Sequence, residues 1–259
     1  MERALSTPAP QALPALDSDA VNRQLHDDPG GAAATLLAAA RAGHPAAQTW
    51  LGQLYLDGRG VPADGGEARY WFQRAAQCDM PMAMNMLGRC HENGWGGAVD
   101  FPLAVAWYRR AAGFNLDWAI YNLAQMALNG RGMPRDQAAA FHGFTRATAL
   151  GHARAMHFLG QFYEYGWEVP VDQAQAFSLY ARSAAGGDYR GLCSWASVLA
   201  GSGRVPEAVP LVERAIALAP AHYLGPLARQ LRNSPHGALR ALATQIAGID
   251  GELAGAHAA

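Results

Sequence analysis

Small and apolar residues return along this chain at a constant interval of 36 residues. The pair Leu51-Gly52 recurs as Leu87-Gly88, and the same step leads on to positions 123, 159 and 195. Five classes of position keep this interval through four units without an insertion. In the first unit they are Leu51-Gly52, Gly58, Asp64, Ala68 and Arg74. A period of this length predicts a stack of helical hairpins.

Within each period, the apolar spacing predicts two amphipathic helices. In the first unit we expect helices over 45–58 and roughly 64–77. Asp64, with Glu67 three residues later, forms a capping-box pattern, and Gly58 suits a left-handed helix end. Because one helix pair cannot bury its own apolar stripe, the units must stack on their neighbours.

The repeat pattern divides the chain into three expected regions. These are a flexible N-terminal arm (1–27), a repeat region (28–220) and a C-terminal helical cap and tail (221–259). The repeat region comprises a half repeat (31–44), four repeats (45–80, 81–116, 117–152 and 153–188) and a degenerate repeat (189–220). Apolar residues in the arm leave open that it docks on the stack; they are Leu13, Leu16, Val21 and Leu25.

The repeated residues resemble the motif of the Sel-one-like repeat family, a close relative of the tetratricopeptide repeat. In the first unit the motif reads Ala47, Leu51, Gly52, Tyr55, Gly58, Gly60, Val61, Asp64, Ala68, Trp71, Ala75 and Ala76. The resemblance implies an all-α fold, a right-handed α-α superhelix (solenoid) of helix pairs. It also implies an adaptor that holds other proteins, since bacterial members of the family accompany many different systems. A cysteine-rich branch linked to penicillin binding has a disulfide in each repeat, and this chain lacks those paired cysteines.

Composition removes several function classes. The 20 basic residues are all arginine and the 21 acidic ones leave a net charge of −1, so no basic surface for nucleic acid is expected. Without lysine there is no Schiff-base amine and no P-loop lysine. No apolar run approaches the ~20 residues of a membrane-spanning helix. Residues 1–20 show no export signal and the three cysteines are irregularly placed, so we expect a cytoplasmic protein.

Candidate catalytic and metal-binding residues have simpler structural interpretations. The loops at 58–60 and 130–132 carry glycines at the repeat period, which indicates helix ends rather than phosphate loops. Cys90, His91 and Glu92 are adjacent on one predicted helix and cannot converge on one metal ion. Cys193 would be activated by Arg190 only if both were exposed. We therefore expect no catalytic residue, cofactor or metal ion.

The strongest functional prediction concerns the first helix of each pair, which lines the concave face in tetratricopeptide-like stacks. Residues opposite the core side of these helices are rich in Arg, Asn, Gln and Tyr, which can bind a peptide backbone or a carboxylate. The predicted groove residues are Gln53, Asn85, Arg89, Glu92, Asn93, Trp118, Tyr121, Gln125, Asn129, Arg154, His157, Gln161, Glu164, Tyr165 and Arg190. Trp95 and Trp167 lie in loops, either as exposed anchors or folded onto their own repeats.

The sequence thus favours a non-catalytic adaptor that binds a protein or peptide partner in its concave groove, without nucleic acid and without membrane insertion. We expect a monomer or weak homodimer. One alternative is an accessory regulator of a neighbouring enzyme or uptake system, for instance one related to iron or redox chemistry. A second is a hydrolase of the cysteine-rich repeat type, which the cysteine pattern disfavours.

Overall fold

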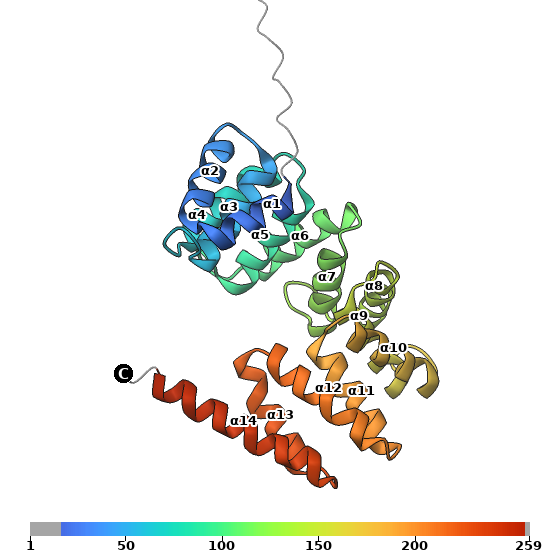
Figure 1. The fold of residues 1–259 in the computed structure, drawn as a ribbon. Coiled ribbons are helices and arrows are strands. Elements are labelled where there is room, and N and C mark those ends of the chain that lie inside the picture. The colour runs from blue at the N-terminus through green and yellow to red at the C-terminus, as the bar shows by residue number, and fades with distance from the viewer. Residues whose placement is uncertain (1–16, 257–259) are drawn as a thin grey trace, which may run out of the picture. The chain divides into compact units, whose positions relative to one another are not determined.

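The computed structural model describes residues 17–256 of the chain (Figure 1). Within this range the regular secondary structure consists of fourteen α-helices. They are α1 (Ser18–Asp27), α2 (Pro29–Arg41), α3 (Pro45–Asp57), α4 (Gly65–Ala76), α5 (Pro81–Asn93), α6 (Phe101–Gly113), α7 (Asp117–Asn129), α8 (Gln137–Ala149), α9 (Ala153–Tyr165), α10 (Gln173–Ala185), α11 (Tyr189–Gly201), α12 (Val205–Leu218), α13 (Ala221–Arg232) and α14 (Gly237–Ala256). The predicted all-α fold of stacked helix pairs is confirmed.

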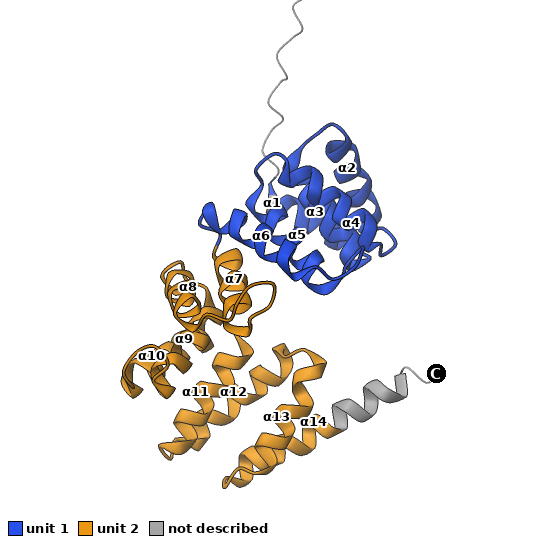
Figure 2. Ribbon diagram, turned by 180° about the vertical axis from the view of Figure 1, so that it is seen from behind, with its two compact units in different colours: residues 1–116 blue, residues 117–259 orange. Residues whose placement is uncertain are grey.

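The helices belong to two compact units, residues 1–116 and residues 117–259 (Figure 2). In unit 1, α3 packs on α4 and α5 packs on α6, while α2 and α4 each pack on the helix that follows them. Unit 2 repeats this pattern through α7 to α12, and α9 also lies directly against α11, the first helix of the next repeat. Helices α13 and α14 pack together, and α14 contacts α12 as well.

Helix ends fall at the positions that recur every 36 residues. The side chains of four aspartates accept hydrogen bonds from backbone N–H groups in the first turns of α4, α6, α8 and α10; they are Asp64, Asp100, Asp136 and Asp172. These bonds satisfy donors that have no partner within the helix. Gly58 ends α3 with φ of 64°, a left-handed conformation that glycine adopts without steric cost.

The expected flexible arm over 1–27 is corrected at residues 18–27, which form α1. Asp17 accepts a hydrogen bond from the backbone N–H of Asp19 at 2.9 Å and begins this helix. Val21 and Leu25 are buried in one cluster with Leu36 of α2 because they share one face of α1. Leu13 lies outside the described residues, as does Leu16.

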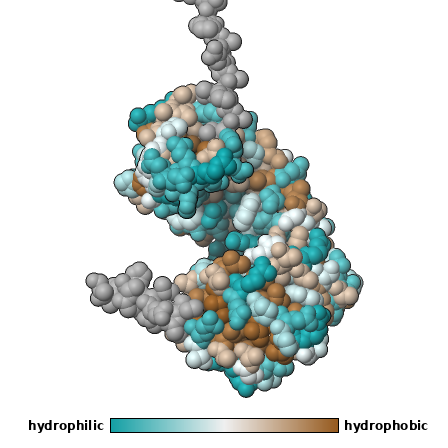
Figure 3. All heavy atoms as spheres, in the orientation of Figure 1, coloured by the Kyte–Doolittle hydropathy of each residue, from teal (hydrophilic) through white to brown (hydrophobic). Residues whose placement is uncertain are grey.

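The core of each unit runs along the seams between its helices. In unit 2 the buried cluster extends from Leu192 through Val212 and Leu227 to Ile246, so α13 and α14 cover the end of the repeats. Hydrophobic residues gather on the visible face of unit 2, whereas hydrophilic residues cover most of the visible face of unit 1 (Figure 3). Within the described residues, no helix combines the length and the apolar character needed to cross a membrane.

Candidate protein-binding site

In unit 1, two of the predicted groove residues come together at an open pocket of about 540 Å³. Gln53 of α3 and Arg89 of α5 both line this pocket, and so does Trp95 from the loop after α5. The Arg89 guanidinium lies 4.9 Å from the centre of the Trp95 ring, a cation–π contact that orients both side chains. Asn93 is exposed and donates a hydrogen bond to the Arg89 carbonyl at 2.9 Å.

Three predicted groove residues are buried instead, which corrects their assignment. Asn85, Tyr121 and His157 occupy equivalent positions 36 residues apart, and each is at most 8% exposed. The next repeat covers this position: the His157 imidazole Nδ1 lies 3.3 Å from the Ser194 hydroxyl of α11. The apolar spacing within one helix pair does not predict this burial, because the neighbouring pair supplies the covering contact.

In unit 2, the N-terminal ends of the first helices bring Trp118 and Arg154 together. The Arg154 guanidinium lies 5.2 Å from the centre of the Trp118 ring, and its Nε is 3.7 Å from a carboxylate oxygen of Asp188. Arg190, one repeat further on, lies over the Tyr189 ring at 4.5 Å. These aromatic and acidic partners hold the arginines in fixed orientations at successive repeats.

Two polar residues beside Arg154 were absent from the predicted set. His152 and Asp188 immediately precede α9 and α11, and their side chains are 3% and 1% exposed. His152 Nδ1 lies 2.8 Å from a carboxylate oxygen of Asp117. Burial lowers the pKa of His152, although the hydrogen bond with Asp117 opposes this. The signal in the sequence was the 36-residue step that joins the two residues, just ahead of each first helix.

The C-terminal ends of the first helices hold most of the remaining groove candidates. Gln125 and Gln161 are half-buried, and Asn129 is exposed and donates a hydrogen bond to the Gln125 carbonyl at 2.8 Å. Glu164 accepts a hydrogen bond from the Tyr180 hydroxyl at 2.5 Å. Glu92 accepts the equivalent bond from the Tyr108 hydroxyl at 2.7 Å in unit 1.

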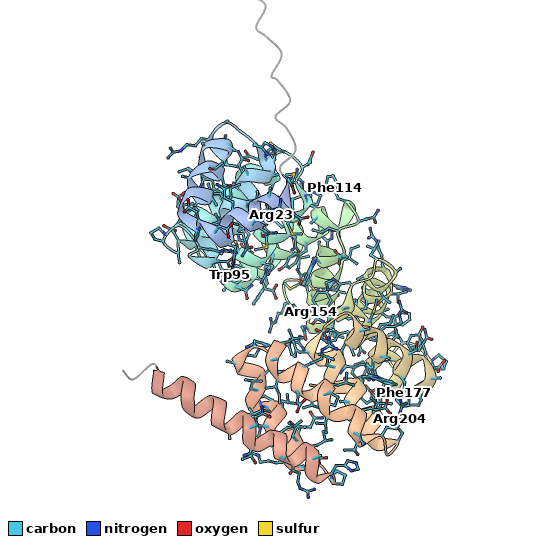
Figure 4. All side chains as sticks on the ribbon, in the orientation of Figure 1. Arg23, Trp95, Phe114, Arg154, Phe177 and Arg204 are labelled. Carbon is cyan, nitrogen blue, oxygen red and sulfur yellow. The ribbon has the colours of Figure 1, made fainter. Side chains whose placement is uncertain are left out.

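An open pocket of about 740 Å³ lies beside Glu164. Tyr165 lines it from the end of α9, together with Phe177 of α10 and Arg204 of the loop before α12 (Figure 4). Tyr165 is 56% exposed, and its ring centre lies 5.1 Å from that of Trp167. Trp167 also contacts the Phe162 ring at 5.6 Å, so this tryptophan lies against the first helix of its own repeat while remaining partly exposed.

The thiols lie in surroundings that disfavour the reactive thiolate. Cys90 and Cys193 are buried, and burial raises the pKa of each thiol to about 11. Activation of Cys193 by Arg190, which required exposure, is therefore contradicted. In the described range, no group of three or more His, Cys, Asp or Glu side chains is placed to hold a metal ion.

Stacked pairs of helices, each capped at the same positions every 36 residues, define an α-helical repeat protein. The family model described as Sel1 repeat matches residues 45–80, 81–112, 119–152 and 153–188. Because these matches cover more than half of the sequence, the chain belongs to the Sel1 repeat family. No curated protein matches it significantly.

Solved structures share this fold at low sequence identity. A Sel1 repeat protein from Oxalobacter formigenes is 23% identical with a TM-score of 0.71, and the match covers 86% of this chain and 93% of that one. The protective antigen c5321 of uropathogenic Escherichia coli, which has an SLR fold, is 21% identical with a TM-score of 0.64, over 90% of this chain and 53% of that one. The immunity protein Pa5087 of Pseudomonas aeruginosa is 16% identical with a TM-score of 0.51, over 88% and 76%. These likenesses show the fold alone.

Proposed function

We propose that the protein is a non-catalytic adaptor that holds a partner polypeptide against the first helices of its repeats. The observation that carries this proposal is the placement of Trp118, Arg154 and Arg190 at one repeat position in three successive first helices. Oriented arginine and tryptophan side chains are enriched among the residues that dominate binding energy at protein interfaces. Sel1 repeat proteins generally mediate protein–protein interactions, which supports the same class of function.

The partner we propose is a cytoplasmic polypeptide, bound in extended or helical form along the exposed side of α7, α9 and α11. Free cysteines fit a reducing compartment, because Cys78, Cys90 and Cys193 are all unpaired by disulfides. Asn129 adds an exposed amide on α7. An amide of this kind can bond to the peptide backbone of a partner, and Arg154 can pair with a carboxylate.

The test is the affinity for a purified partner, first recovered by capture from the native extract. Arg154→Ala should raise the Kd at least about tenfold, which corresponds to a loss of about 1.4 kcal/mol. Asn129→Ala should raise it less, because a neutral amide contributes a weaker hydrogen bond. Helical content measured by circular dichroism should stay unchanged in both variants.

Arg182→Ala is the matched control, since Arg182 is an exposed arginine on α10, the second helix of the same repeat as Arg154. Its Kd should equal that of the wild type. Equal Kd values for Arg154→Ala and Arg182→Ala would contradict binding on the first-helix side.

A further inference from the structure

Unit 2 has an open pocket of about 460 Å³ whose buried polar side chains are not explained by the proposed groove. Residues at the N-terminal ends of α7, α9 and α11 line it, with Leu218 from the end of α12. We call it the N-terminal pocket. Its side-chain lining is formed by Asp117, Trp118, His152, Arg154, Asp188, Tyr189 and Leu218.

Two buried polar atoms in this lining have no hydrogen-bond partner. The carboxylate of Asp188 accepts a bond from the Gly191 backbone N–H at 3.0 Å through one oxygen, while its other oxygen, Oδ1, accepts none. Arg154 Nε lies 3.7 Å from Oδ1, which is an ion pair longer than a hydrogen bond. His152 Nε2 is also without a partner.

Both of these atoms are acceptors. His152 Nδ1 faces a carboxylate oxygen of Asp117, which can only accept, so the proton of the neutral imidazole resides on Nδ1. That tautomer leaves a lone pair on Nε2. A buried acceptor without a hydrogen bond destabilises the folded protein, so a ligand that supplies donors to both atoms recovers this free energy.

The charged side chains of the lining nearly balance one another. Two carboxylates, of Asp117 and Asp188, and one guanidinium, of Arg154, belong to its lining, and burial lowers the pKa of His152 so that the imidazole is neutral at pH 7. The charges of these lining side chains sum to −1, and Arg190 lies beside them over the Tyr189 ring. The same carboxylates lie at the N-terminal ends of α7 and α11, whose partial positive charge offsets part of theirs, so it is the acceptors without a hydrogen bond that favour a cation.

The pocket also has apolar surface that can contact the hydrocarbon part of a ligand. Trp118 is 39% exposed and Leu218 is 53% exposed, and both border the pocket. An aliphatic stem that ends in a cation buries its methylene groups against such surfaces while its head reaches the acceptors.

We propose that the N-terminal pocket binds the ammonium or guanidinium group of a lysine or arginine side chain from the partner polypeptide. Asp188 Oδ1 and His152 Nε2 accept its hydrogen bonds, and Trp118 and Leu218 contact its stem. The inference rests on the proposed adaptor function, because it assigns the cation to a bound partner. The chain itself contains no lysine, so any lysine bound here comes from another molecule.

The test uses small cations on the full-length protein. Binding is followed by NMR through the indole N–H resonance of Trp118 in protein labelled with ¹⁵N-tryptophan. The resonance that disappears in Trp118→Phe is assigned to Trp118. Titration with n-butylammonium or n-propylguanidinium should give a saturable shift, and n-butyrate should give none. The two cations distinguish a lysine site from an arginine site by their relative affinity.

Asp188→Asn is the decisive variant, because asparagine caps a helix as well as aspartate and removes only the charge. It should weaken binding of the cations at least about tenfold, the effect of losing about 1.4 kcal/mol. Asp172→Asn is the matched control: Asp172 caps α10 and does not line the pocket, so affinity should be unchanged. His152→Phe keeps a ring at this position, removes Nε2 and should weaken binding severalfold.

The absence of a saturable shift with either cation, equal binding of butyrate, or unchanged affinity in Asp188→Asn would each overturn the proposal. Failure here is distinguishable from failure of the adaptor function. If a partner is lost by Arg154→Ala and Asn129→Ala while the cations do not bind, the adaptor function stands and the pocket proposal is wrong. If the cations bind through Asp188 while those two variants retain the partner, the pocket is a cation site and the proposed placement of the partner on the first-helix side is wrong.

Discussion

At Gly88 in unit 1 the paired helices α5 and α6 leave no room for a side chain, and adding one methyl group there tests how the repeats pack. Gly88 of α5 faces the ring of Tyr108 on α6: a Cβ atom at residue 88 would lie 2.4 Å from Tyr108 Cε1 and 2.5 Å from Cδ1. Tyr108 is fully buried, and its hydroxyl donates a hydrogen bond to Glu92 at 2.7 Å. The ring therefore has little freedom to move aside.

Two opposing effects determine how much Gly88→Ala changes the free energy of unfolding. Replacing a helical glycine by alanine stabilises a helix by about 1 kcal/mol, because alanine loses less conformational entropy. Overpacking a close-packed core costs about 1–3 kcal/mol. We expect Gly88→Ala to lower the free energy of unfolding by about 1–2 kcal/mol, since the aromatic ring is rigid and its hydroxyl is held.

Gly113→Ala provides the control. Gly113 ends α6, and a Cβ atom there would meet no atom within 4 Å, so only the favourable helix effect remains. Urea unfolding followed by circular dichroism measures both variants. With an m value of about 3 kcal/mol/M, Gly88→Ala should lower the midpoint by about 0.5 M. The reasoning is refuted if Gly88→Ala is as stable as Gly113→Ala.

The third repeat permits a stricter test of the same packing. Its equivalent of Gly88 is Ala124, and the facing helix α8 carries Gly143, where a Cβ atom would lie 2.7 Å from Ala124 Cβ. Gly143→Ala should therefore destabilise, and adding Ala124→Gly should relieve the contact. The double mutant should be more stable than the sum of the single effects predicts, by about 1–3 kcal/mol. Additivity within about 0.5 kcal/mol would contradict the contact.

Three further predictions use the buried polar groups and the thiols. Burial lowers the pKa of His157 to about 3, so the unfolded state takes up the proton first as pH falls. From pH 7 to pH 5 the protein should lose about 2 kcal/mol of stability through this residue, a loss that His157→Asn should abolish in urea titrations at both pH values. Glu164→Leu should cost about 1–3 kcal/mol by leaving the Tyr180 hydroxyl without its acceptor, and adding Tyr180→Phe should recover most of it in the same assay. At pH 8 a maleimide should label Cys78 rapidly and the two buried cysteines only on unfolding, as mass spectrometry of the native protein would show.

The sequence was sufficient for features that depend on a few neighbouring residues. The aspartate caps and the glycine helix ends recur at one interval, so each repeat supports the interpretation of the others. Helix α1 was missed because its buried residues, Val21 and Leu25, lie outside the repeated segment. A single short apolar stripe does not distinguish a docked helix from a flexible segment.

The candidate site was harder to predict because burial depends on contacts between repeats. His157 is a polar residue on the predicted groove side of its helix, and only the position of α11 shows that it is buried. Conversely, Asp188 lies outside the series of aspartates that recurs in the sequence, and the structure shows that it caps α11. Its unpaired oxygen beside Arg154 becomes visible only when α9 and α11 are placed side by side.

Glu92 and Glu164, the two acidic residues of the predicted groove set, are explained by packing within their own repeats. At two linked positions, repeats 2 and 4 carry glutamate with tyrosine, whereas repeats 1 and 3 carry leucine with phenylalanine: the pairs are Glu92 with Tyr108, Glu164 with Tyr180, Leu56 with Phe72 and Leu128 with Phe144. A buried tyrosine hydroxyl requires an acceptor, and a phenylalanine ring does not. Each glutamate is therefore specified by the ring that it meets, without reference to a partner. Trp118 and Arg154 contact each other and the buried His152 and Asp188, yet Trp118 remains 39% exposed and the Arg154 side chain 43% exposed at the N-terminal pocket. Trp118 and Arg154 therefore support partner binding more strongly than the two glutamates do.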